Sequence, residues 1–320
     1  MSDAIEIEHH HAHVNGIRYH YAEAGAGPLV VMIHGFPDLW YAYRSQLTAL
    51  AAAGYRAVAI DLRGFGTSEV TARVEDYSLL QHGEDVNALI ASLGVQTVTL
   101  VGHDWGANLV WAMALRYPAL VQRVVALSIP FYPEPRDPAE IKRYAQGRFN
   151  FMEYFQRPGA AEAEFQKNPR QFLLAFLYGL SGDAPAGTIE RLYQGKPADA
   201  SLLEGFPLPE RLPGWLSEAD LDYYVAAFEK TGLSGALGFY RNLERDYAPL
   251  KAVYRNTLSQ PVLFIGGAEE AAVRFGSLDP MRRALPQLKK ALVLPGCGHW
   301  VQQERAEIVN RELISFLKLV

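Results

Sequence analysis

Val101-Gly102-His103-Asp104-Trp105-Gly106-Ala107 is the stretch around which the fold of this chain can be predicted. Residues 97–101 before it are apolar and β-branched, which predicts a buried strand, and the spacing of apolar residues over 107–116 predicts a helix. A strand, a Gly-x-x-x-Gly turn and a helix form the layout of a nucleophile elbow. The two glycines leave space for a strained residue that projects its side chain. Asp104 occupies that position and is the first candidate for a nucleophile.

Further buried-strand patterns alternate with helical patterns along the chain. A hairpin is predicted over residues 6–24, and continuous apolar runs cover residues 28–33, 55–60, 121–128, 261–265 and 291–294. This alternation predicts an α/β fold with a mostly parallel sheet and helices on both faces.

The strand patterns stop between residues 131 and 259. Helical, aromatic-rich sequence with clustered prolines replaces them. We therefore predict a core formed by residues 1–130 and 260–320, with residues 131–259 inserted as a helical lid domain.

The composition limits the classes of partner. The formal net charge is -5, which argues against nucleic-acid binding, and Cys297 is the only cysteine, which excludes a disulfide framework. No apolar run approaches the roughly 20 residues of a membrane span. The first residues do not resemble a secretory signal, so we expect a cytoplasmic protein, either a monomer or a homodimer.

Four histidines, at positions 9, 10, 11 and 13, lie in the first arm of the predicted hairpin. Histidine-rich tracts bind metals in some proteins. Here alternate side chains of a strand point to opposite faces, so we favour an ordinary hairpin without a metal. Asp61 and Arg63 follow a buried strand, and we predict that they form a structural ion pair rather than catalytic groups.

Three candidate catalytic residues follow three predicted strands. They are Asp104, Glu270 and His299, in the order nucleophile, acid and histidine that an α/β hydrolase uses. Open α/β sheets place their sites at the carboxyl ends of the strands, which is where all three would lie. Glu269 is the alternative acid because it is adjacent to Glu270.

An aspartate nucleophile predicts a particular chemistry. Its carboxylate is already ionised at neutral pH and suits displacement at an sp³ carbon, which yields an alkyl ester on Asp104. Hydrolysis of that ester needs His299 to activate a water, and Glu270 to orient and stabilise the imidazolium. It also needs an oxyanion hole, for which we predict the backbone N–H groups of Phe36 and Trp105.

Six motifs run across nearly the whole chain. They are His34-Gly35-Phe36-Pro37, Asp61-Leu62-Arg63-Gly64-Phe65-Gly66, Gly102-His103-Asp104-Trp105-Gly106, Phe155-Gln156-Arg157-Pro158-Gly159, Phe239-Tyr240-Arg241-Asn242 and Gly298-His299-Trp300. Together these motifs resemble those of the soluble epoxide hydrolases of bacteria, plants and mammals, which have the α/β-hydrolase fold. The resemblance implies a cofactor-free enzyme without a metal. Its expected substrates are water and a small epoxide, which the aromatic lid suggests is an apolar aryl or alkyl one.

The resemblance also implies two lid tyrosines that donate protons to the epoxide oxygen. Tyr240 matches one of them. Phe151 stands where the other is expected and has no hydroxyl, and Tyr154 is the nearest substitute. We predict that Phe151 and Tyr154 both lie in the substrate pocket.

Two other functions fit parts of the same pattern. A haloalkane dehalogenase uses the same Asp and His, but it needs halide donors such as the indole groups of Trp105 and Trp215. A hydrolase-fold ligand receptor without activity is the third hypothesis, because Phe151 and Glu270 depart from the family pattern.

Overall fold

One eight-stranded sheet forms the centre of the protein in the computed structural model, which describes residues 5–320. The strand order is β1-β2-β4-β3-β5-β6-β7-β8. β1 and β2 pair antiparallel to their neighbours, and all pairs from β4 to β8 are parallel. The predicted mostly parallel α/β architecture is therefore confirmed. The strands are β1 (Glu8–Val14), β2 (Ile17–Ala24), β3 (Leu29–Ile33), β4 (Arg56–Asp61), β5 (Val98–His103), β6 (Val121–Leu127), β7 (Val262–Gly267) and β8 (Leu288–Leu294).

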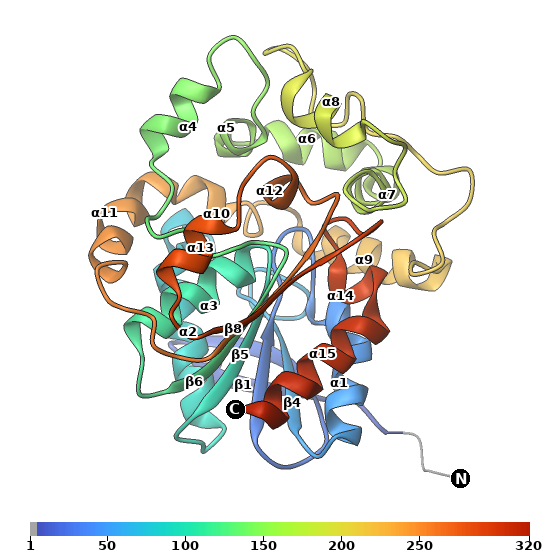
Figure 1. Ribbon diagram of the computed structural model, residues 1–320. Coiled ribbons are helices and arrows are strands. Elements are labelled where there is room, and N and C mark those ends of the chain that lie inside the picture. The colour runs from blue at the N-terminus through green and yellow to red at the C-terminus, as the bar shows by residue number, and fades with distance from the viewer. Residues whose placement is uncertain (1–4) are drawn as a thin grey trace.

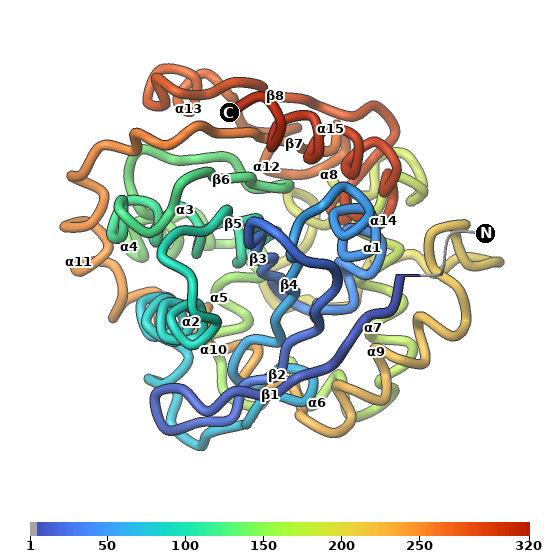
Figure 2. The backbone as a smooth tube through the Cα atoms, turned by 90° about the horizontal axis from the view of Figure 1, so that it is seen from below, coloured from blue at the N-terminus to red at the C-terminus, as the bar shows by residue number. Residues whose placement is uncertain are grey.

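Helices cover both faces of this sheet. Figure 2 shows α1 (Arg44–Ala52) and α15 (Ala306–Leu319) on one side, with α2 (Leu79–Ser92) and α3 (Trp105–Arg116) on the other. β5 is buried along its whole length, and its successive residues Leu100 and Val101 belong to the apolar clusters on opposite faces. This two-sided burial explains why the central strands are continuous apolar runs.

The chain between β6 and β7 is helical, and the structure describes all of it. Figure 1 shows α4, α5, α6 and α8 gathered beyond the carboxyl ends of the strands. The helices of this segment are α4 (Pro138–Tyr144), α5 (Phe151–Gln156), α6 (Ala160–Lys167), α7 (Pro169–Gly179), α8 (Thr188–Gln194), α9 (Glu218–Thr231), α10 (Gly238–Arg241) and α11 (Leu243–Val253). The remaining short helices are η1 (Trp40–Tyr43), η2 (Val74–Tyr77), α12 (Ala271–Arg274), α13 (Asp279–Ala284) and α14 (Val301–Glu304).

Within residues 5–320, none of the helices is both long enough and apolar enough to cross a membrane. The predicted hairpin of the histidine-rich stretch is confirmed as β1 and β2. The prediction that Asp61 and Arg63 pair with each other is wrong. Asp61 accepts from the ring of His20 at 2.7 Å, whereas Arg63 binds Asp85 at 2.7 Å, so the two side chains anchor the loop to different elements.

Candidate active site

Asp104 lies at the turn between β5 and α3. Its backbone has φ 55° and ψ -120°, which is a strained conformation for a residue with a side chain. A Cβ atom on Gly102 would lie 2.2 Å from the carbonyl oxygen of Gly106, and one on Gly106 would lie 2.0 Å from that of Ile33. Only glycine therefore fits at these two positions, and the close packing around them holds Asp104 in its strained conformation.

The three predicted catalytic residues meet at the carboxyl edge of the sheet. The Nε2 atom of His299 lies 3.7 Å from Oδ2 of Asp104, and its Nδ1–H donates to Oε2 of Glu270 at 2.6 Å. Glu270 is buried, with 5% of its surface exposed. Glu269 turns away and pairs with Arg274. The structure thus places Glu270, and not Glu269, against the histidine.

The backbone of His299 is held on both sides. Its N–H donates to the carbonyl of Leu180 at 2.8 Å, and its carbonyl accepts from the hydroxyl of Ser128 at 2.5 Å. The carboxylate of Glu304 accepts from the N–H groups of Gly298 and Trp300, at 2.8 and 2.9 Å. Ser128 and Glu304 are positioning residues that the sequence analysis missed, since nothing in their local sequence distinguishes them.

The electrostatics of the three groups are coupled. Burial raises the pKa of Asp104, and the charge of His299 offsets this only in part. Burial also disfavours a charged imidazole, but the carboxylates of Glu270 and Asp104 outweigh it and raise the pKa of His299 to about 9. Against the effect of burial, the charge of His299 holds the pKa of Glu270 below its usual range. At neutral pH the imidazole of His299 in the free site is therefore protonated.

The backbone groups predicted for the oxyanion hole lie beside the carboxylate of Asp104. The N–H of Phe36 donates to Oδ1 of Asp104 at 2.9 Å. Burial is the largest influence on the pKa of Asp104 and raises it, whereas the backbone N–H of Trp105 is among the groups that lower it. Oδ1 therefore accepts from the N–H of Phe36 while Oδ2 faces His299, so the two carboxylate oxygens have different surroundings.

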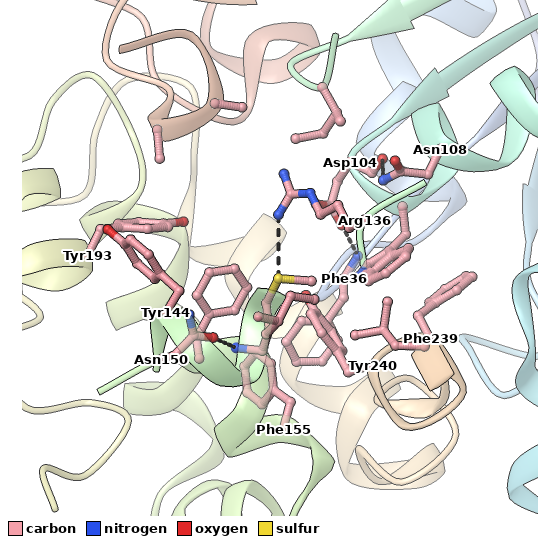
Figure 3. A pocket seen from close by; sticks show the side chains of 18 of the residues that line it. Phe36, Asp104, Asn108, Arg136, Tyr144, Asn150, Phe155, Tyr193, Phe239 and Tyr240 are labelled. Carbon is pink, nitrogen blue, oxygen red and sulfur yellow. Dashed lines mark hydrogen bonds between the residues drawn. The ribbon is translucent and has the colours of Figure 1, made fainter. Parts of the chain in front are cut away.

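A cavity of about 470 Å³ opens above Asp104 and is lined mainly by aromatic side chains from the helical segment and the loops of the core. Figure 3 shows Asp104, Phe36 and Tyr240 around it. The ring of Phe151 lines the cavity and packs 6.2 Å from that of Tyr240, centroid to centroid. Phe151 thus lies in the pocket as predicted and contributes an apolar surface.

Tyr240 is fixed by the other residues of its motif. Phe239 stacks on Trp105 with 5.1 Å between ring centroids, Arg241 binds Glu162 at 2.7 Å, and the Asn242 amide donates to the carbonyl of Val74 at 2.6 Å. These contacts tie α10 to the elbow, to α6 and to η2. Burial, followed by the charge of Asp104, raises the pKa of Tyr240 well above its usual value, so its hydroxyl stays protonated.

Two side chains considered in the sequence analysis do not line this cavity. The hydroxyl of Tyr154 donates to Glu164, so the prediction that Tyr154 lies in the pocket is wrong. The indole N–H of Trp215 donates to Asp183 at 2.9 Å, outside the cavity. Tyr193 of α8 does line it, with its ring 5.5 Å from that of Phe151, although its sequence surroundings carry no recognisable motif.

Comparisons with known proteins agree with this geometry. A family model described as the alpha/beta hydrolase fold matches residues 28–306. Epoxide hydrolase A of Mycobacterium tuberculosis is 34% identical over 308 residues, which is 95% of each chain. The chain belongs to the epoxide hydrolase family. A solved epoxide hydrolase from an endophytic Streptomyces is 43% identical, with a TM-score of 0.92 over 98% of this chain and 95% of the other.

A plant relative extends the similarity. Epoxide hydrolase 3 of Siraitia grosvenorii is 34% identical over 98% of each chain. This member of the epoxide hydrolase family therefore matches relatives over both its sheet and its helical segment. The predicted family is confirmed.

The two adjacent glutamates give a matched pair of variants. We expect Glu270→Gln to lower kcat by a factor on the order of a thousand or more, because it removes the charge that sets the tautomer and stabilises the imidazolium of His299. Glu269→Gln should change kcat by less than about twofold, since it breaks only an exposed ion pair. Steady-state diol formation measures both. Equal losses in the two variants would contradict the placement of Glu270.

Proposed function

We propose that this protein hydrolyses epoxides to vicinal diols through a covalent ester on Asp104, with His299 as the base. One observation supports this best: the Oδ2 atom of Asp104 faces His299 at 3.7 Å, while Oδ1 accepts from the N–H of Phe36 at 2.9 Å. One oxygen is free to attack, and the other is already in a position that suits an ester carbonyl. The hydroxyl of the buried Tyr240 supplies an acid within the same cavity.

In the first step, Oδ2 attacks one carbon of the epoxide ring. A carbon–oxygen bond forms to Asp104 as the ring carbon–oxygen bond breaks, and Tyr240 gives its proton to the departing oxygen. The products are a neutral hydroxyalkyl ester and a tyrosinate. General acid catalysis of this kind contributes about a hundredfold to ten-thousandfold.

In the second step, His299 in its neutral form, reached by loss of its proton to solvent, takes a proton from water, and the hydroxide adds to the ester carbonyl carbon. Phe36 and Trp105 stabilise the resulting oxyanion. The intermediate collapses by breaking the bond between the ester carbonyl carbon and the alkyl oxygen, and the imidazolium protonates that oxygen to complete the diol. The acid proton left on Asp104 returns to Tyr240, so the sum is one epoxide plus one water.

We further propose that residues 131–259 act as the lid of this site. They contribute Phe151, Tyr193 and Tyr240 to the cavity walls, which limits the access of bulk water to the ester. Trp215 has its indole N–H bound to Asp183 and so does not offer a second halide donor. This contact favours an epoxide over a haloalkane as the substrate.

A single-turnover experiment in heavy-oxygen water tests the covalent route. With enzyme in excess over styrene oxide, we expect the heavy oxygen to enter Asp104 and the diol to remain unlabelled, because the oxygen that reaches the diol comes from the carboxylate. Peptide and product mass spectrometry measure both fates. Heavy oxygen in the diol of the first turnover would mean direct attack by water and would overturn the ester.

A second measurement addresses ring opening. Tyr240→Phe is expected to slow single-turnover alkylation by about a hundredfold or more, because the epoxide oxygen then leaves without its proton donor. Tyr154→Phe is the matched control, since that hydroxyl lies outside the cavity, and it should stay within about threefold of the parent. Near-parental alkylation by Tyr240→Phe would show that another group supplies the proton.

A further inference from the structure

Arg136 is a charged side chain at the cavity that the proposed chemistry does not use. It lies in the proline-rich connection between β6 and α4, next to Pro135, and both residues line the cavity. Figure 3 shows its side chain reaching over the cavity among Asp104, Tyr193 and Tyr240. Arg136 is an exposed residue, which places it at the solvent-facing opening of the cavity.

The guanidinium group has unfilled hydrogen-bonding capacity. Its Nη1 atom lies 3.4 Å from the sulfur of Met152, and its Cζ lies 5.4 Å from the ring centroid of Tyr132. Among residues 5–320, no carboxylate oxygen lies within 4.0 Å of its nitrogens. A thioether is a weak acceptor, and a guanidinium has five N–H donors in a planar fork.

The acidic residues at the same opening are engaged elsewhere. Asp137 accepts from the N–H of Ala139 at 2.8 Å and caps α4, while Glu140 lies 3.5 Å from Arg143. Two other cations line the cavity and already have partners: Lys196 donates to the carbonyl of Leu202 at 2.6 Å, and His299 donates to Glu270 at 2.6 Å. Arg136 is therefore the cation left to meet a ligand.

The charge of Arg136 influences the pKa values of two of the proposed reacting groups. Burial is the largest influence on the pKa values of Glu270 and Tyr240, and the charge of Arg136 acts on both in the downward direction. A neutral apolar epoxide would cover part of this cation without giving it a partner, which is unfavourable. A substrate that carries an anionic group would instead accept hydrogen bonds from the guanidinium.

We infer that the cavity is built for epoxides that carry a carboxylate, and that Arg136 binds this carboxylate at the cavity opening while the epoxide faces Asp104. A singly charged carboxylate fits better than a phosphate dianion, because Asp137 and Glu140 also line the opening. The inference rests on the proposed function and names the substrate class of the same site. It replaces the purely apolar substrate expected from the sequence with one that has an apolar body and an anionic end.

Matched acid and amide substrates test this inference. The probes are the para- and meta-carboxylates of styrene oxide and their primary amides, which share a carbon skeleton and differ in charge. For at least one isomer we expect the parent enzyme to prefer the acid by about tenfold in kcat/KM, and Arg136→Gln to lower this acid-to-amide ratio by about tenfold, the low end for a charged hydrogen bond. Arg136→Lys should retain part of the preference, because it keeps the charge and loses the fork.

Arg282→Gln is the control, since it removes the same charge from an exposed position on α13, away from the cavity lining, and should leave the ratio unchanged. Thermal melting followed by circular dichroism verifies that each variant is folded. A ratio that is equal in the parent and in Arg136→Gln overturns the inference and leaves the proposed function standing, as does an equal loss for acid and amide. If no probe, including styrene oxide, gives diol or alkylates Asp104, the proposed function fails and the inference fails with it.

Discussion

Asp104→Asn is expected to lower kcat for diol formation by about a millionfold, the loss seen when a hydrolase is deprived of its nucleophile. An amide in this position is neutral and a far poorer nucleophile than the carboxylate. The fold should persist, because the amide keeps the size of the side chain and its oxygen can still accept from the N–H of Phe36. Chromatography of the diol measures the rate, and protein mass spectrometry should show no adduct.

Asp222→Asn provides the control for this experiment, since it changes a carboxylate that is exposed and paired with Arg170. Peptide mass spectrometry also has to establish that the amide of Asp104→Asn has not reverted to the acid. If the verified amide enzyme forms diol within tenfold of the parent rate, Asp104 is not the nucleophile.

His299→Gln is expected to separate the two half-reactions. Alkylation of Asp104 needs no base and should proceed, whereas ester hydrolysis should slow by a factor on the order of ten thousand or more. The protein should therefore gain the mass of one substrate, on the peptide that contains Asp104. His13→Gln, at an exposed position of β1, is the matched control and should turn over normally. Complete absence of the adduct during a single turnover would contradict the scheme.

The pH dependence of hydrolysis follows from the same contacts. His299 is a base only when neutral, so the hydrolysis rate should rise with pH and level off above its pKa. In the free enzyme burial opposes the charge, but Glu270 and Asp104 raise this pKa to about 9. Alkylation removes the negative charge that lies 3.7 Å from Nε2 of His299, and once Tyr240 is protonated again we expect the pKa in the ester to fall below that value. We expect single-turnover hydrolysis to show an apparent pKa below about 9, and a value at or above it would contradict this coupling.

Much of the architecture was readable from local sequence. Buried parallel strands are contiguous apolar runs, and the tight turn at Gly102 and Gly106 admits no other residue, so both leave a strong signal in a short stretch. The order of Asp104, Glu270 and His299 then predicted their meeting, because parallel strands bring their carboxyl ends to one edge. The motif around Tyr240 was equally informative, since its neighbours anchor α10 through contacts that depend on residue type.

The direction of individual side chains was decided by tertiary structure. Glu269 and Glu270 are adjacent and chemically identical, and only the path of the loop after β7 turns Glu270 towards His299. The hydroxyl of Tyr154 donates to Glu164 on another helix and lies outside the pocket, whereas Tyr193 of α8 lines the pocket.

The position of Arg136, which we propose determines substrate specificity, was likewise not predictable from the sequence. Its local sequence indicates a proline-rich connection and nothing more, yet the packing of that connection over the sheet brings a cation without a carboxylate partner to the cavity that Asp104 faces. The sequence by itself determined the fold and the candidate reacting groups, because these depend on short-range patterns and strand order. Which side chains surround the substrate depends on helices far apart in the chain that pack against one another, and only the folded structure brings them together.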